Sequence, residues 1–513
     1  MTSTWKQYEA GKEYKRRIGF YEQGRRNERF YRGDQWYGSE GKDLPKPVFN
    51  VVKRVVDYLV CTVASDRFSL VYTDENLPFL RDAETARQIR QALAVMNDNA
   101  AYRWDKCRMD DKIYQLLLDA AIFGDGVAYC YWDSEAGGGE YRGDVAVQTV
   151  DAANLFASDM NRADIQSQDY IILSGRQKAS ALRAEALAAG VSPEAARKIL
   201  PDEETDVGAG SRAGTELADE DGKATYLIKF YREDGHVVFE KSTRECLIRR
   251  VITDCKLYPV AHLSWVPVKN SFHGVAPVSE MIPNQKFINR AYGMVMKHMT
   301  DTAFSKVVYD KSRIPEWTNE VGEAIAVVGA TNVSDAVSVV GTGEMQGGYL
   351  SLIESAIAST KELMGATETA LGNTVPNNTS AILALREASK ISLGHIESAL
   401  CCCIEDIANI WADMMCAYYS DERLLPFWRD GEAASETVDL ALLRSCLIRA
   451  RVDVRETVQY STSTTTALLD KLLDGGYIDA STYLSYLPDG LFPERRAILE
   501  AKEVLKHERG DDE

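Results

Sequence analysis

The residue types that most often carry out chemistry are all present in this sequence, but their spacing matches no known catalytic pattern. Six histidines are scattered along the chain, and none has a second histidine four residues away, as a helical zinc site needs. The Gly-Lys pairs that begin at Gly11, Gly41 and Gly222 are followed by Glu, Asp and Ala, where a phosphate-binding loop needs Ser or Thr. The spacing therefore predicts neither a zincin-type metal site nor a P-loop motor.

Nucleophilic and carboxylate chemistry is equally unsupported. The sequence has no Gly-x-Ser-x-Gly turn, and its 77 acidic residues are too numerous for any one pair to stand out. We therefore predict a protein that is not an enzyme and needs no cofactor. The alternative is a nucleic-acid-modifying enzyme with its active site between Asp57 and Pro277, where carboxylates are common, and metal-dependent nuclease activity would favour it.

Composition narrows the class of partner. The chain has 513 residues, 45% of them hydrophobic, so several packed regions are expected. The net charge is −18, the wrong sign for a surface that grips a nucleic-acid backbone over a large area. Any contact with DNA is expected to be local or weak.

The cysteines and the amino terminus indicate where the protein is made. The ten cysteines show no metal-ligand spacing, and the run Cys401, Cys402 and Cys403 lies in an apolar helical pattern, so we expect small buried thiols. The segment from Met1 to Tyr21 is charged and lacks an apolar signal core, and no window is apolar enough for a membrane span. A cytosolic protein with reduced thiols is expected.

Two helices are predicted near the amino terminus. Trp5 to Tyr31 combines charged and aromatic residues at helical spacing, which predicts one amphipathic helix ended by Gly33. Its arginines could touch phosphate, but interleaved glutamates favour a solvated face. The apolar face of Val48 to Val60 predicts a core helix.

A mixed region follows, up to about Pro277. Its patterns predict helices at 82–97 and 105–123 and strands at 127–132, 145–150, 170–174, 226–231 and 236–239. This is typical of an α+β domain. Residues 201–221 have almost no large apolar side chain and predict a surface loop, to which we assign no function.

The second half is organised around long helices. Residues 278–302 predict one long amphipathic helix, and a second helix begins near Gly348 and ends near Gly372. Between them, short β-rich runs at 306–309, 324–328 and 337–340 predict an inserted sheet. A polar break at 373–380 precedes an unusually long helix from Ser380 to about Tyr418, followed by strand-like residues at 448–460 and two short helices within 467–487.

This order of parts resembles the portal proteins of tailed double-stranded DNA bacteriophages. Local matches along most of the chain support the resemblance. Phe30 to Trp36 resembles the family's F-Y-x-G-x-Q-W segment, Gly274 to Arg290 with Gln285 and Asn289 resembles the start of its stem helix, and Thr379 to Ile382 resembles the end of its tunnel loop. Further matches lie at Pro47–Asn50, Val55–Val60, Gly365–Thr367, Leu371–Gly372, Leu468–Asp470 and Gly475–Asp479 with Leu484. Apart from the resemblance, a packed aromatic helix end explains Phe30 to Trp36 better than a ligand site, and the same holds for Gln285 and Asn289.

The resemblance implies a portal-like α+β fold with a mixed α/β wing. Its parts are a wing with the amino-terminal region (1–276), a first stem helix (277–304), a β-rich clip (305–346), a second stem helix (347–371), a tunnel loop (372–380), a very long wing helix with returning strands (381–462) and a carboxy-terminal helical crown (463–513).

The resemblance also implies a function and a set of partners. The chain would form a ring, usually of twelve subunits, at a unique capsid vertex, through which DNA is packaged and later ejected. Its implied partners are other copies of itself, double-stranded DNA bound without sequence preference, the terminase large subunit, head-completion or adaptor proteins, scaffold and the major capsid protein, with no membrane. The implied location is the virion, after assembly in the host cytoplasm. A structural capsid protein without a channel is a further alternative.

Candidate site residues follow from this picture. A channel through which DNA slides would be slippery if it were acidic or neutral, with short-lived polar contacts to phosphate. The implied tunnel-loop residues are Asn373, Thr374, Pro376, Asn377, Asn378 and Thr379. Candidate stem and clip charges are Lys297, Lys306, Glu354 and Lys361, and candidate clip residues for partner binding are Lys311, Arg313 and Trp317. Each basic side chain has an alternative role as a surface ion-pair partner of Glu316, Glu354 or Glu362, and the loop could be an ordinary connection between helices.

Overall fold

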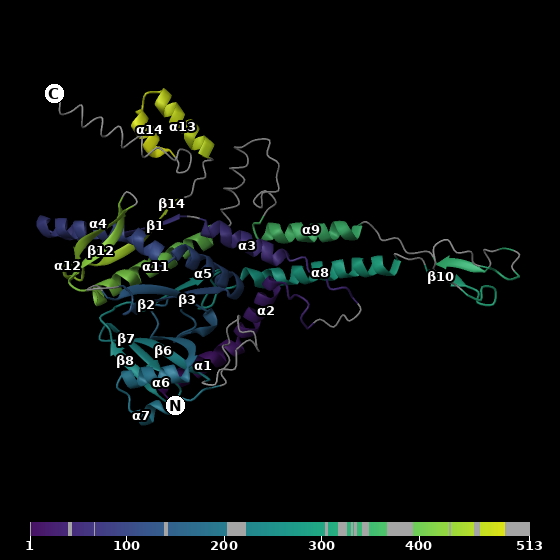
Figure 1. The fold of residues 1–513 in the computed structure, drawn as a ribbon, viewed down its shortest axis with the longest axis horizontal. Coiled ribbons are helices and arrows are strands. Elements are labelled where there is room, and N and C mark those ends of the chain that lie inside the picture. Colours follow the sequence, from purple (N-terminus) through teal and green to yellow (C-terminus); the bar gives the residue numbers. More distant parts are fainter. Residues whose placement is uncertain are drawn as a thin grey trace. The chain divides into compact units, whose positions relative to one another are not determined.

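The computed structural model describes most of the chain, in two compact units (Figure 1). The described residues are 2–38, 44–65, 67–137, 142–202, 222–302, 306–316, 326–329, 332, 336–340, 348–366, 393–429, 432–455 and 462–487. The first unit comprises Met1–Ala64 and Ser69–Asp453, and the second comprises Ser65–Phe68 and Val454–Glu513.

The amino-terminal segment forms two helices where one was predicted. Helix α1 (Ser3–Arg17) and helix α2 (Phe20–Arg32) are separated by Gly19, whose φ of 71° belongs to the left-handed region that glycine adopts freely. The prediction of a solvated face is wrong for Lys15, which is fully buried. The helix predicted at Val48 to Val60 is α3 (Val51–Ala64).

Two further helices follow, and the second of them packs against the strands of the first sheet. Helix α4 (Ala83–Lys106) is longer than predicted, and α5 (Met109–Phe123) follows after Arg108, which turns the chain with a φ of 49°. Helix α5 contacts β2 (Asp125–Asp133), α2, α3 and α8, so it lies at the centre of the first unit. Its buried face includes Leu117 and Ala120, both without exposed surface.

Two antiparallel sheets form the mixed region. The first has the order β3-β2-β9, with β3 at Asp144–Val150 and β9 at Val260–Ser264. The second has the order β4-β5-β6-β7-β8. Its strands are Leu155–Ala157, Tyr170–Lys178, Lys223–Glu233, His236–Ser242 and Leu247–Ile252. All five predicted strands are present, whereas β4, β8 and β9 were not predicted, because short strands carry little alternation.

The elements α6 (Ala179–Ala188), α7 (Pro193–Ala196), η1 (Leu77–Phe79) and η2 (Ala152–Asn154) are short connections that were also not predicted. Helix α6 covers one side of the second sheet through contacts with β5, β6 and β8. Apolar residues of α6 and α7 pack there with Ile248.

The two long helices predicted on either side of the β-rich insert are present, although the second ends at Leu363, before the predicted end near Gly372. The first part of the helix predicted from Ser380 lies outside the described residues. Helix α8 (Pro277–Thr302) and helix α9 (Gly348–Leu363) contact each other and run side by side (Figure 1). In the chain they flank the hairpin of β10 (Lys306–Tyr309) and β11 (Val337–Val340), which pair antiparallel. The predicted strand at 324–328 is wrong for residues 326–328, which are irregular.

The chain then returns to the first sheet. Helix α11 (Gly394–Tyr418) contacts β2, β3 and β9, and the antiparallel hairpin of β12 (Glu422–Arg429) and β13 (Glu432–Asp439), which was not predicted, contacts α4. The single turn α12 (Leu440–Leu443) precedes β14 (Ile448–Arg455), which pairs with β1 (Arg67–Asp74). On α11, Cys403 is buried as expected, but Cys402 is exposed, which corrects that prediction.

The second unit contains two short helices, α13 (Thr462–Asp474) and α14 (Ala480–Tyr486), which contact each other. They fall where two short helices were predicted, and Gly476, with a φ of 69°, lies between them.

Candidate functional site at helices α8 and α9

The first half of α8 is fixed to α3 by a buried glutamine. Gln285 Oε1 accepts hydrogen bonds from the backbone N–H groups of Val51 (2.9 Å) and Val52 (3.2 Å), and its Nε2 donates to the carbonyl of Phe49 (2.8 Å). The first N–H groups of a helix have no partner within that helix. Gln285 therefore caps α3 from α8.

The same network reaches the segment after α2. Gln285 Nε2 also donates to Asn289 Oδ1 (2.9 Å), and Asn289 Nδ2 donates to Gln35 Oε1 (2.6 Å). Gln35 in turn donates to the carbonyl of Phe30 (2.9 Å) and to Asn50 Oδ1 (3.0 Å). Gln35, Gln285 and Asn289, singled out in the sequence, thus meet in the interior as packing contacts.

Close approaches fix α8 from other sides, as far along the helix as Gly293. A Cβ added at Gly293 would lie 2.7 Å from the carbonyl oxygen of Pro45, so only glycine allows this approach. The rings of Phe49 and Tyr292 lie 4.2 Å apart. Asn27 of α2 donates to Ser279 Oγ (2.8 Å) and to the carbonyl of Ile122 (2.7 Å). The start of α8 is therefore held by α2, α3 and α5 together.

A buried carboxylate fixes the segment that leads into α8. Asp125, at the start of β2, lies 3.1 Å from His262 Nε2 and 2.6 Å from His273 Nδ1, and it accepts from the backbone N–H of Gly274 (2.9 Å) and from Ser264 Oγ (3.4 Å). An ionised carboxylate only accepts, so both ring nitrogens that face it carry a proton.

The electrostatics of this cluster favour a structural role. Burial alone would raise the pKa of Asp125, but its bonds to His262 and His273 hold that pKa well below its usual range. Burial lowers the pKa of His273 despite the neighbouring carboxylate. Asp125, His262 and His273 are each at most 7% exposed, so a substrate would have no access to them. The cluster of Asp125, His262 and His273 holds β2, β9 and the entry to α8 together, and we call it the pin.

A buried lysine lies on the other side of this pin. Lys15 Nζ donates to the carbonyls of Ala152 (2.7 Å), Ala153 (3.0 Å) and Leu155 (2.6 Å). Burial lowers the pKa of Lys15 to about 7, although Asp151 and Asp125 oppose this. All of its donated bonds go to backbone carbonyls, which indicates that it holds α1 against the turn η2.

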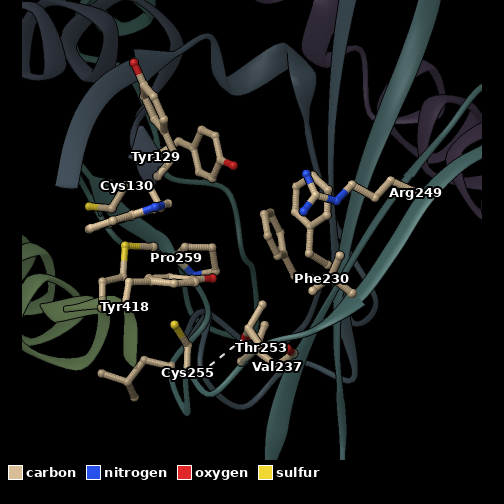
Figure 2. Close-up of a pocket in the computed structure, with 15 residues that line it drawn as sticks. Tyr129, Cys130, Phe230, Val237, Arg249, Thr253, Cys255, Pro259 and Tyr418 are labelled. Carbon is tan, nitrogen blue, oxygen red and sulfur yellow. Dashed lines mark hydrogen bonds between the residues drawn. The ribbon is translucent and has the colours of Figure 1, made fainter. Parts of the chain in front are cut away.

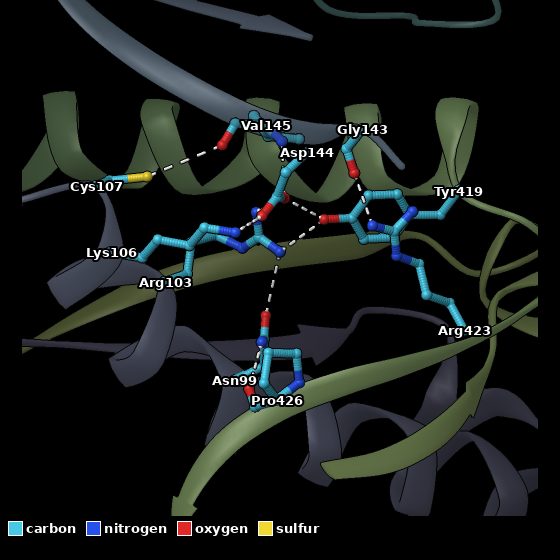
Figure 3. A network of polar contacts seen from close by, with 10 residues as sticks. All are labelled: Asn99, Arg103, Lys106, Cys107, Gly143, Asp144, Val145, Tyr419, Arg423 and Pro426. Carbon is cyan, nitrogen blue, oxygen red and sulfur yellow. Dashed lines mark hydrogen bonds and ion pairs between the residues drawn. The ribbon is translucent and has the colours of Figure 1, made fainter. Parts of the chain in front are cut away.

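A second ionic network joins α4, β3, α11 and the β12 strand (Figure 3). Arg103 donates to Asp144 Oδ1 (2.9 Å) and to the hydroxyl of Tyr419 (2.9 Å), and Lys106 pairs with Asp144 Oδ2 (2.5 Å). Burial alone would raise the pKa of Asp144. Its contacts with Arg103, Lys106 and Tyr419 outweigh burial and hold that pKa well below its usual range. Arg423 donates to the carbonyl of Gly143 (2.7 Å). These contacts fasten the β12–β13 hairpin to the first sheet.

A hollow of about 210 Å³ lies between the two sheets and the end of α11 (Figure 2). Aromatic side chains dominate its lining, among them Tyr129, Phe230 and Tyr418. Burial raises the pKa of the Cys130 thiol, and it raises that of Cys255 to about 12. Thiols held in the protonated form are poor nucleophiles. The hollow therefore offers apolar surface and no activated nucleophile.

The second half of α8 and the outer side of α9 differ from the anchored half. Their large apolar side chains face solvent, with Met299 58% and Leu352 54% exposed. The other exposed ones are Met294, Met296, Tyr349, Leu350 and Leu363, and Phe287 of the anchored half is exposed as well. Exposed apolar residues grouped on adjacent helices indicate a surface that another chain covers.

The predicted stem and clip charges are dispersed. Lys297 pairs with Asp301 one turn later on α8 (3.9 Å), and Arg313 pairs with Asp310 in the turn after β10 (3.5 Å). Lys311 is exposed in that turn. Glu354 is exposed on α9, and Lys361 is half-buried near its end. The ion pairs of Lys297 and Arg313 are thus with neighbours in sequence, where Glu316, Glu354 and Glu362 were the expected partners.

Several predicted site residues lie outside the described residues. These are Trp317 and all six tunnel-loop residues, Asn373, Thr374, Pro376, Asn377, Asn378 and Thr379. Lys306 begins β10, and its side chain is likewise outside the description.

Sequence reasoning missed the pin at Asp125. His262 and His273 are 137 and 148 positions from Asp125, so no short motif could reveal the cluster. The pairing of β2 with β9 brings His262 to Asp125, and the bridge between Val266 and Val275 brings His273 back to the same place. Within the described ranges, no group of three or more His, Cys, Asp or Glu side chains could hold a metal ion. In the same ranges, no helix has the length and apolar character to cross a bilayer.

Comparison with known proteins agrees with this arrangement. A search of curated proteins found no match to the chain. Residues 255–466, from the end of the second sheet through α8, α9 and α11 to the start of α13, match the family model of the phage P22-like portal protein. Proteins of that family have a structural role in the phage. The match of residues 255–466 supports the assignment of this chain to the phage portal protein family.

Proposed function

We propose that this chain is the subunit of a ring-shaped channel at one vertex of a phage capsid, through which double-stranded DNA is packaged and later ejected. The family implies a homo-oligomeric ring and a location in the virion capsid in general terms. The finer statement, that the ring carries DNA and receives the terminase, is our proposal.

The observation that carries the proposal is the contrast along α8, inside the matched region. Gln285 and Asn289 fix its first half to the start of α3 and to the segment after α2, whereas apolar side chains of its second half and of α9 face solvent. A rigid base with an apolar extension is what a wall built from several copies requires, because each copy must bury its extension against the next.

The domain assignments follow the same picture. We assign α8 and α9 to the stem and the β10–β11 hairpin with its turn, including Lys311 and Arg313, to the clip, where terminase or adaptor proteins would dock. Residues 372–380 would form the tunnel loop, residues 1–276 and 381–462 the wing, and α13 and α14 belong to the crown. Scaffold and the major capsid protein would contact the wide side of the ring.

The proposed channel does no chemistry. The buried Asp125 cluster is closed to substrate, and the Cys130 and Cys255 thiols are held protonated. DNA would pass by short-lived contacts, since dense Lys and Arg linings hold phosphates too strongly for sliding. The net charge of −18 supports a channel of this kind.

Imaging of the purified chain, together with its mass in solution, tests the proposal. The expected result is a ring with a central hole and a mass near twelve times 57.1 kDa. A homogeneous monomer or dimer at all concentrations would contradict it, and nuclease activity that requires a divalent metal would favour the enzyme alternative instead.

A further inference from the structure

Helices α8 and α9 carry opposite charges on their exposed surfaces. Lys286 and Arg290 are exposed in the middle of α8, one helical turn apart, so they lie on one face. Lys297 continues this face toward the end of the helix. On α9, the exposed charges include Glu354 and Glu362.

These groups are not paired with one another within the subunit. Among the ion pairs between described residues, none joins Lys286 or Arg290 of α8 to Glu354 or Glu362 of α9. Lys286 only lies over the ring of Phe30 of α2, 5.8 Å from its centre, and this contact leaves its charge without a carboxylate. Among the described residues, these two cations and two anions thus have no ion-pair partner.

The apolar residues beside these charges point to a protein partner. Phe287 and Met294 lie next to Lys286 and Arg290 along α8 and are 45% and 54% exposed. Leu352 and Leu363 stand close in sequence to the two glutamates on α9. Charges that border exposed apolar side chains are the arrangement of an interface with a polar rim.

From these observations we infer that the basic face of α8 in one copy docks on the acidic face of α9 in the next copy, with Lys286 and Arg290 near Glu354. The inference rests on the proposed ring. In a ring the contact is head-to-tail, so two different faces must be complementary to each other. Rotation about the ring axis, which would run along the stem, leaves the position of each residue along that axis unchanged. The middle of α8 in one copy can therefore meet the middle of α9 in the next.

The charges would decide the direction and register of the contact more than its strength. Apolar surface alone would allow α8 to pack on α8 of another copy, but that packing would bring Lys286 and Arg290 of both copies together. Like charges in contact disfavour such wrong pairings. Opposite charges on α8 and α9 therefore select a closed head-to-tail ring over a two-fold dimer.

A charge-swap experiment on the full-length chain tests the inference. The measured quantity is the protein concentration at which half of the chains are in rings, determined from the mass in solution. We expect K286E/R290E alone, and E354K/E362K alone, to raise this concentration about tenfold or more. The combined variant with all four substitutions restores the opposite charges and should return this concentration to near the wild-type value. The matched control is R87E/R90E on α4, which makes the same charge change on an exposed helix face and should assemble as the wild type does.

Distinct outcomes separate this inference from the proposed function. If the wild type forms no ring, the proposed function fails and the inference falls with it. If the wild type forms rings and K286E/R290E assembles equally well, only the inference fails. The inference is also overturned if the fourfold variant does not assemble, although circular dichroism shows that all variants keep the helical content of the wild type. A K286E/R290E ring that is intact but binds DNA more weakly would assign this face to nucleic acid instead.

Discussion

The two halves of α8 have the same periodicity but opposite environments. In the first half, Gln285 and Asn289 are buried, and their side chains bond to the start of α3, to each other and to Gln35 after α2. In the second half, Met294 and Met299 face solvent. One helix therefore serves two purposes, since its base is fixed by the fold of the subunit and its extension is left for a neighbouring copy.

The comparison teaches where stability and assembly reside. Buried polar contacts contribute most when their loss leaves a partner unsatisfied. Exposed apolar groups contribute little to the subunit and much to an interface. Substitutions at the base should therefore lower the stability of the subunit, and substitutions in the extension should affect assembly.

The largest effect is expected at the pin before α8. Asp125→Ala would leave His262, His273 and the N–H of Gly274 without their acceptor, and we expect a loss of about 3–5 kcal/mol in the free energy of unfolding. Calorimetric melting of the variant and the wild type measures this loss. Asp98→Ala, at an exposed position of α4, is the control and should cost less than about 0.5 kcal/mol. Equal melting temperatures for the two variants would show that the pin does not stabilise the base.

A smaller loss is expected at the cap of α3. Gln285→Ala would leave two N–H groups of α3 and the carbonyl of Phe49 unpaired, at a cost of about 2–3 kcal/mol. Amide hydrogen exchange should also quicken at Val51 and Val52. The neighbouring Asn284→Ala serves as control, and exchange that stays as slow in Gln285→Ala as in this control would contradict the cap.

A pH-dependent effect is expected beside the base, at Asp119 of α5. Burial, with Asp151 and Glu28 nearby, raises the pKa of Asp119 from 3.8 to about 7. A raised pKa in the folded state favours folding below pH 3.8, and this contribution is lost as the pH rises to 7. Asp119→Asn removes the cost of burying a charged carboxylate. At pH 8 we expect its free energy of unfolding, measured with urea, to exceed that of the wild type by about 1–2 kcal/mol, and at pH 4 we expect the two values to be nearly equal. A gain of the same size at both pH values would refute the titration of Asp119.

The smallest effect on the subunit is expected in the extension. Met294→Ser and Leu352→Ser should change the melting of the dissociated subunit by less than about 0.5 kcal/mol, because both side chains are already exposed. The same variants should weaken ring assembly in solution. A large loss of subunit stability, or unchanged assembly, would contradict the assignment of the second half of α8 to assembly.

Much of the fold could be predicted because long periodic patterns are strong signals. The period of α8 was visible from Met281, Ile282 and Ile288, all buried in the structure. The break at Gly19 was missed, since the charged and aromatic pattern continues across it. The β12–β13 hairpin was missed as well, because polar residues such as those of Glu432–Asp439 show little apolar alternation.

The candidate site was predicted only in part. Gln285 and Asn289 were identified from a resemblance, and the structure shows their role as packing contacts of the base. The burial of Lys15 could not be predicted, because its helix carries charges on all sides and only the carbonyls of η2 explain it. The tunnel-loop residues remain a prediction.

The sequence by itself determined the order of parts, with two helices flanking a β-rich insert, because local periodicity and turn residues act over a few positions. Tertiary structure decided which polar residues are buried together. Asp125 meets His262 across 137 positions only because β2 pairs with β9, and Gln285 caps α3 only because α8 crosses its start. Contacts between distant segments depend on how strands and helices pack, and a linear pattern does not record that packing.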